Sequence, residues 1–131
     1  MPLNTRTHRT SQEGQAVVEL AIILPVLLIL LLSIWQMGVV YDKWQNLNGA
    51  AREGARAAVV AQPGQEMSDA RAAANAAVAG QLNLSSFTLR STTVSGTAYY
   101  TATACSPYAV NILGIVVKSG NLCRDATMRV E

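Results

Sequence analysis

The chain has 131 residues, half of them hydrophobic, and a formal net charge of +2. This length suits one small domain together with an anchor. The basic residues are scattered and aromatic residues make up only 5% of the chain. The composition therefore argues against a nucleic-acid-binding protein, which needs a basic patch and usually aromatic side chains for base stacking.

Residues 1–14 are polar and rich in Thr, Ser and Arg, without a core-forming pattern. We interpret them as a leader rather than a folded element.

Arg6 and Arg9 precede a long apolar run, whose other end is followed by Asp42 and Lys43. Acidic residues count little in the positive-inside rule, so the two arginines favour a cytoplasmic N-terminus and an external C-terminal part.

Residues 20–41 contain no charged side chain. At ~1.5 Å per residue they would form about 33 Å of helix, against roughly 30 Å for the hydrocarbon core of a bilayer. We predict a transmembrane segment over 20–41, within a helix over 15–62 that "QPG" at 62–64 ends. Pro25 has no amide hydrogen for the carbonyl of Ala21, so a kink is expected there.

Alanines and glycines form a small-residue surface over residues 49–58. Such a surface lets another backbone approach closely. It would receive either a second helix of the same chain, predicted over 66–82 with Ser68 near its cap, or other subunits; we favour the first for this outer part. The second helix carries alanines at helical spacing: Ala70, Ala73, Ala74 and Ala77.

Three aromatic residues, Trp35, Tyr41 and Trp44, lie near the outer end of the apolar run. We interpret them as an interfacial belt, because Trp and Tyr are enriched where a membrane meets water. A face that binds a partner protein is the alternative.

From residue 85 onwards the sequence favours strands. "SFTLRSTTV" and "TAYYTATAC" flank Ser95-Gly96, which predicts a β-hairpin. "NLCRDATMRVE" alternates like a strand with one buried face, although Arg124 interrupts the buried register. "YAVNILGIVV" is apolar without a clear period and fits a strand, a short helix or a buried loop.

The predicted fold class is therefore α+β. A long N-terminal transmembrane helix is followed by a second short helix and a small C-terminal antiparallel sheet of about three strands. Residues 63–131 form the extracytoplasmic head.

Cys105 and Cys123 fall in the second and last predicted strands. In an oxidising exterior a disulfide between them would stabilise the head by about 3 kcal/mol in the chain-entropy model. We favour this disulfide over two free buried thiols.

Catalysis is poorly supported by the sequence. The only histidine, His8, lies in the predicted leader, so the mature chain would have no imidazole for general-base or metal chemistry. The sequence shows no phosphate-binding loop, metal motif or nucleophile elbow. We expect no catalytic residue, no metal and no cofactor.

The string Gly14-Gln15-Ala16-Val17-Val18-Glu19-Leu20 resembles the processing site of type IV prepilin-like proteins. The longer context over residues 12–60 resembles TadE-like pseudopilins of Tad (Flp) pilus systems, including the proline early in the apolar run and "AAREGARAA". The closing "ATMRVE" also resembles the end of that family's domain. The resemblance implies that a prepilin peptidase cuts after Gly14, on the cytoplasmic side, and that Glu19 becomes the fifth residue of the mature chain.

The residues support this resemblance in physical terms. A secretory signal is cut after its apolar segment at a small-residue site, and no such site follows this run. A cut after Gly14 would instead free an α-amino group on Gln15. Because Gln15 and Glu19 are four residues apart, they share a helix face. The carboxylate would pair with the amine of its own or an adjacent subunit and set the axial register between helices.

The resemblance implies a non-enzymatic minor pilin in the bacterial inner membrane, crossing it once, that enters the pilus or stays at its base. The implied partners are the prepilin peptidase, the major Flp-type pilin, other pseudopilins, the inner-membrane assembly platform and membrane lipid, with no nucleic acid. The alternative is an unprocessed signal-anchored surface binding module. A secreted soluble protein would require cleavage after the apolar run.

Overall fold

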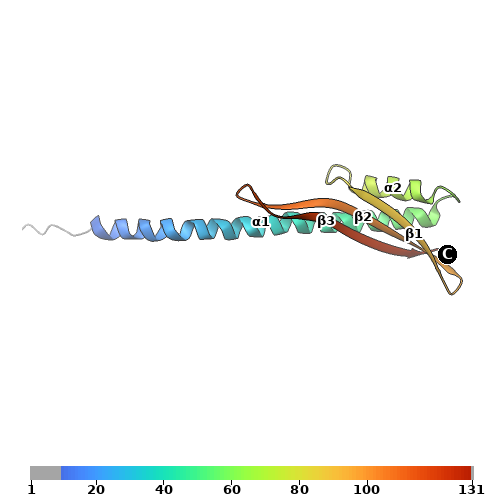
Figure 1. Ribbon diagram of the computed structural model, residues 1–131, viewed down its shortest axis with the longest axis horizontal. Coiled ribbons are helices and arrows are strands. Elements are labelled where there is room, and N and C mark those ends of the chain that lie inside the picture. Colours follow the sequence, from blue (N-terminus) through green and yellow to red (C-terminus); the bar gives the residue numbers. More distant parts are fainter. Residues whose placement is uncertain (1–9, 131) are drawn as a thin grey trace, which may run out of the picture. The chain divides into compact units, whose positions relative to one another are not determined.

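The computed structural model describes residues 10–130 as two helices and one sheet. Residues 1–9 of the predicted leader lie outside the described residues. They include Arg6, His8 and Arg9. The elements in chain order are α1 (Thr10–Val60), α2 (Glu66–Ala77), β1 (Ser86–Val94), β2 (Thr97–Ile112) and β3 (Ile115–Arg129) (Figure 1). The α+β prediction is confirmed.

The chain divides into two compact units, Met1–Trp35 and Gln36–Glu131. The described part of the first unit is the N-terminal half of α1, which continues as helix through Pro25. Its side chains from Gly14 onwards are nearly all exposed. The hydroxyl of Ser33 donates a hydrogen bond to the carbonyl of Ile29 at 2.7 Å, so this polar group is satisfied within the helix.

The second unit contains residues 36–60 of α1, together with α2 and the sheet (Figure 1). The three strands are antiparallel in the order β1-β2-β3. The core is formed mainly by small side chains from both helices and the first two strands: Leu47, Ala50, Ala51, Ala55, Ala58, Ala70, Ala74, Val78, Phe87, Ala102 and Ala104. The small-residue surface predicted over residues 49–58 therefore packs within the chain, against both α2 and the sheet.

Gly54 is the closest point of this packing. A Cβ atom built on Gly54 would lie 2.7 Å from Cζ of Phe87 and 3.2 Å from the carbonyl oxygen of Ala70. A Cβ atom essentially never lies 2.7 Å from a carbon atom, so any other residue at position 54 would require the Phe87 ring or the α2 backbone to shift. Gly49 is also in α1, but a Cβ there would meet no described atom within 4 Å.

The second helix was predicted over 66–82, but it ends earlier, at Ala77. The chain continues in turns, in which the amide of Leu82 donates to the carbonyl of Val78 at 3.3 Å. Gly80 has a φ of 79°, which is incompatible with a continuing α-helix. Ser68 acts locally, donating to the carbonyl of Gln65 at 2.8 Å.

Two tight turns connect the strands. Ser95 and Gly96 have φ of 50° and 82°, and Leu113 and Gly114 have φ of 51° and 83°. Positive φ at both central residues is typical of two-residue hairpin turns. The ambiguous stretch "YAVNILGIVV" is thus the end of β2, a turn and the start of β3, with a shift of register between Val110 and Asn111.

The two sheet faces differ in polarity. On β3, the inner face carries Leu122, Arg124, Ala126 and Met128, each half-buried. The outer face is polar and rich in threonine, and the hydroxyls of Thr101 and Thr127 lie 2.8 Å apart on neighbouring strands.

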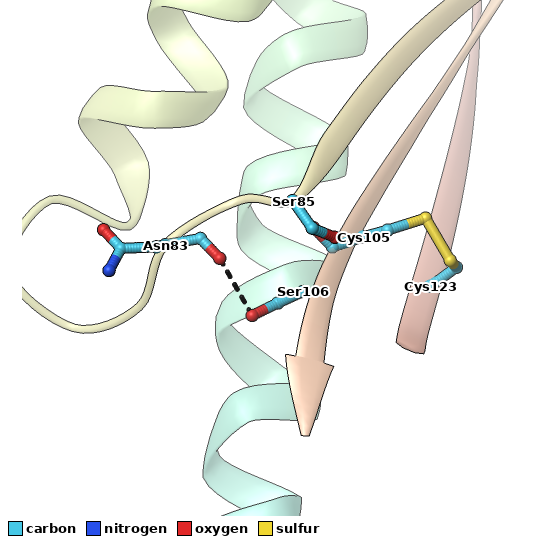
Figure 2. Close-up of a disulfide and its surroundings, with 5 residues drawn as sticks. All are labelled: Asn83, Ser85, Cys105, Ser106 and Cys123. Carbon is cyan, nitrogen blue, oxygen red and sulfur yellow. Dashed lines mark hydrogen bonds between the residues drawn. A yellow bond between two sulfur atoms is a disulfide. The ribbon is translucent and has the colours of Figure 1, made fainter. Parts of the chain in front are cut away.

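A disulfide joins β2 and β3 on the outer face (Figure 2). Cys105 and Cys123 are direct partners in the strand register, with Cα atoms 4.1 Å apart and an S–S distance of 2.09 Å. The adjacent Ser106 is buried and its hydroxyl donates to the carbonyl of Asn83 at 2.9 Å. The amide of Ser85 donates to the carbonyl of Cys105 at 2.8 Å. The cross-link therefore lies where the loop after α2 enters the sheet.

Replacing Gly54 by alanine should destabilise the head, because the new methyl group must displace the Phe87 ring or the α2 backbone. We expect the free energy of unfolding to fall by about 1–3 kcal/mol, the usual cost of overpacking. The matched change Gly49→Ala should instead raise it by about 0.5–1 kcal/mol, because alanine is favoured over glycine in a helix with open space around it. Denaturant unfolding of the full chain in detergent micelles measures both; equal effects of the two changes would contradict this packing.

Replacing both cysteines by serine should lower the free energy of unfolding of the head by about 3 kcal/mol, because the cross-link closes a loop with a sequence separation of 18. The control is the double change Thr101→Val and Thr127→Val, which removes an outer-face contact without opening a covalent loop and should cost only about 1 kcal/mol. Mass spectrometry of the native chain before and after thiol alkylation reports the bond directly. Two alkylated cysteines without prior reduction would refute it.

Candidate functional site

Gly14, Gln15 and Glu19 lie near the start of α1, and all three are exposed. The side-chain nitrogen of Gln15 donates to a carboxylate oxygen of Glu19 at 3.4 Å. This contact is long for a hydrogen bond. It nevertheless places the carboxylate beside residue 15, on the helix face that their spacing predicts.

The Gly14–Gln15 peptide bond lies inside the helix, which begins at Thr10. A peptidase that cut this bond would need the backbone extended, so the first turn would have to unwind. Glycine favours such unwinding, because in a helix it is less stable than alanine by about 1 kcal/mol. Helix ends also fray more readily than helix interiors. The bond is therefore helical, but at a position where the helix opens easily.

The helix after Glu19 is apolar on all sides, and between residues 14 and 41 Glu19 is the only charged side chain. The large apolar side chains from Val17 to Leu32 are 37–70% exposed. Of the two described helices, α1 alone is long and apolar enough to cross a membrane. So large an apolar surface calls for lipid or another protein around it.

The head contains one charged contact that the sequence indicated only indirectly. The guanidinium carbon of Arg124 lies 4.5 Å from the centre of the Trp44 ring, a cation–π distance. Trp44 also stacks on Tyr41, with ring centres 5.7 Å apart. Within residues 10–130, Nε of Arg124 is buried and lacks a hydrogen-bond partner. The arginine that broke the predicted apolar alternation therefore lies on the inner face, over an aromatic ring.

This contact changes the interpretation of the aromatic residues. Trp35 and Tyr41 are 72% and 60% exposed, as an interfacial belt requires. Trp44 is half-buried and belongs to the packing of the head. The other predicted positions belong to different units. Pro25 is in the first unit with Gly14 and Glu19, whereas Cys105 and Cys123 are in the second.

The outer face of the sheet offers little for catalysis. A shallow depression there is lined by Thr88, Leu89, Arg90, Thr101, Thr103 and Asp125. Its side chains are threonines, one leucine, one arginine and one carboxylate, and no histidine lines it. Among the described residues, no three His, Cys, Asp or Glu side chains are grouped to hold a metal ion.

Comparison with known proteins identifies one family. The family model described as TadE-like protein matches residues 14–56. This range includes Gly14, Glu19, Pro25 and Gly54. Neither the curated proteins nor the solved structures give a match. The family match supports a component associated with a Tad pilus that carries an N-terminal apolar helix. Residues 14–56 are therefore a TadE-like segment, and the family resemblance seen in the sequence is confirmed.

Proposed function

We propose that this protein is a non-enzymatic minor pilin-like component in the biogenesis of a Tad (Flp) adhesive pilus. The observation that carries the proposal is the TadE-like segment itself, in which a fully exposed apolar helix follows directly on Gly14 and Glu19. An apolar helix of this kind suits two environments in turn, the bilayer before assembly and a bundle of pilin helices afterwards.

In this proposal a prepilin peptidase cuts after Gly14 and frees the α-amino group of Gln15. The contact between Gln15 and Glu19 supports this step, because the carboxylate already lies beside residue 15. A positive amine at the membrane edge is stabilised by a nearby anion. When the carboxylate meets the amine of a neighbouring subunit instead, the pair fixes how far one helix is displaced along the other.

The proposed location is the inner membrane, with the N-terminus in the cytoplasm and the head outside. The uncharged run over residues 20–41 supports a single crossing. A disulfide between Cys105 and Cys123 fits a head in an oxidising compartment. The proposed partners are the processing peptidase, the major Flp-type pilin, companion pseudopilins and the membrane assembly platform.

The proposed role is non-enzymatic, and the proposed cleavage is consistent with it. The cut after Gly14 removes His8, the only histidine of the chain. The protein would then act through its surfaces, with the helix as the assembling stem and the α+β head as the part that distinguishes it from other pilins.

The mature N-terminus tests the processing step. Mass spectrometry of the protein from cells with the prepilin peptidase should give a chain beginning at Gln15, and from cells without it an intact leader. Gly14→Leu should block cutting, because a bulky side chain keeps the backbone from the catalytic groups. Gly38→Leu, a matched change farther along α1 at a site with open space, should leave it intact. A native chain that keeps residues 1–14 would favour the unprocessed signal-anchored binding module.

The charge of Glu19 tests the assembly step. Glu19→Gln preserves the shape of the side chain and removes its charge, so insertion and processing should persist. Co-isolation with the major pilin should fall by about ten-fold or more, because the partner amine is left without its counter-ion. Glu53→Gln, at an exposed carboxylate of α1 in the head, is the control and should have little effect. Normal incorporation of the Glu19→Gln protein into pili would exclude the register role.

A further inference from the structure

The β2–β3 hairpin ends in an exposed apolar tip, which we define as Leu113, Ile115, Val116 and Val117. These side chains are 71%, 71%, 58% and 61% exposed. Beyond Cys105, β2 has lost its pairing with β1, so the hairpin continues as a two-stranded ribbon. Four large apolar groups at the end of such a ribbon are unfavourable in water and indicate a surface that something covers.

The turn geometry does not require these residues. The hairpin at Ser95-Gly96 has nearly the same backbone angles as the one at Leu113-Gly114, yet it places serine where the tip has leucine. Leucine is a poor choice for positive φ, which favours Gly, Asn and Asp. Leu113 therefore occupies a backbone position that disfavours leucine, and the turn itself does not account for an apolar side chain there.

Two hydrogen bonds fix the level of the tip along α1. The side-chain amide of Gln36 donates to the carbonyl of Asn111 at 2.7 Å, and the ammonium group of Lys43 donates to the carbonyl of Pro107 at 3.4 Å. All four residues belong to the second unit. The ribbon thus runs along residues 36–43 of α1 (Figure 1). Asn111, two residues before the tip begins, lies beside Gln36 in the uncharged run.

We propose that the apolar tip inserts into the outer interface of the membrane that α1 crosses, as a second point of attachment for the head. This inference rests on the membrane anchoring assumed in the proposed function. Residues 36–41 of the uncharged run are at membrane depth in that arrangement. Asn111 is bonded to Gln36, so the tip that follows Asn111 also reaches the membrane. The bond to Asn111 also gives the Gln36 amide a partner within the chain at the membrane boundary.

The insertion is shallow, because the ribbon is open on both edges. Unpaired backbone N–H and C=O groups are too costly in the hydrocarbon core, but they can bond water and headgroups at the boundary. Lys118, which is exposed next to the tip, can reach lipid phosphate groups from this depth. Lys43 and Asp42 lie along the same stretch of α1, within the headgroup region.

Quenching of tryptophan fluorescence by brominated lipid tests the insertion. The full chain is reconstituted into vesicles of phosphatidylethanolamine and phosphatidylglycerol with the variant Ile115→Trp. The added emission should lose most of its intensity when the lipids carry bromine near the headgroup end of the acyl chain, and less when bromine is near the methyl end. The matched control is Val94→Trp, an exposed strand residue beside the other turn, whose emission should be unaffected.

The outcomes separate this inference from the anchoring. The parent chain, compared with Trp35→Phe, reports quenching of Trp35 and hence whether α1 is inserted. Quenching of Trp35 without quenching at residue 115 overturns the tip insertion and leaves the anchor in place. A photo-reactive residue at position 115 that cross-links to another pilin in cells, with no quenching in vesicles, also overturns it. Failure to quench Trp35 overturns both.

Discussion

The head depends on one constraint, the close approach of backbones along the small-residue face of α1, formed by Ala50, Ala51, Gly54, Ala55 and Ala58. Alanine buries little apolar area, so a core built from it gains modest stabilisation per residue. Among the described residues, Leu47 is the largest side chain that is fully buried. Such a core is stable only if its elements lie very close together, and Gly54 sets that distance for α2 and β1 at once. The disulfide and the Arg124–Trp44 contact then supplement a core that is short of apolar area.

Sequence reasoning predicted the parts of the fold that follow from local pattern. The apolar run gives α1, the alanine spacing gives α2, and the glycine at residue 96 gives the first hairpin. The extended part of β2 and β3 was not predictable in this way. Strand signals come from alternation between a buried and an exposed face, and residues 113–121 are exposed on both faces. The prediction placed the end of α2 at residue 82, whereas the helix ends at Ala77. Gly80, with its positive φ, lies in the turns that follow the helix.

In the candidate site, too, contacts within one helix were predictable and contacts between distant segments were not. Gln15 and Glu19 lie together because one helix fixes residues four apart, so their contact follows from spacing. The contacts of Gln36 with Asn111 and of Trp44 with Arg124 join residues far apart in the sequence. Spacing carries no information about such pairs until the sheet register is known. The one signal was indirect, namely an arginine on the face of β3 that the apolar alternation assigned to the core.

The polar groups along α1 explain why Glu19 is the residue on which assembly would depend. In the uncharged run, the Ser33 hydroxyl bonds to the carbonyl of Ile29 and the Gln36 amide bonds to the carbonyl of Asn111. Each group makes a hydrogen bond within the chain, which lowers the cost of transferring it into lipid or into a helix bundle. Glu19 differs, because its contact with Gln15 is long and leaves most of its hydrogen-bonding capacity unused. A carboxylate at the edge of an apolar helix has a strong requirement for a cation, and the amine that the proposed cleavage would free, on this subunit or the next, would meet that requirement.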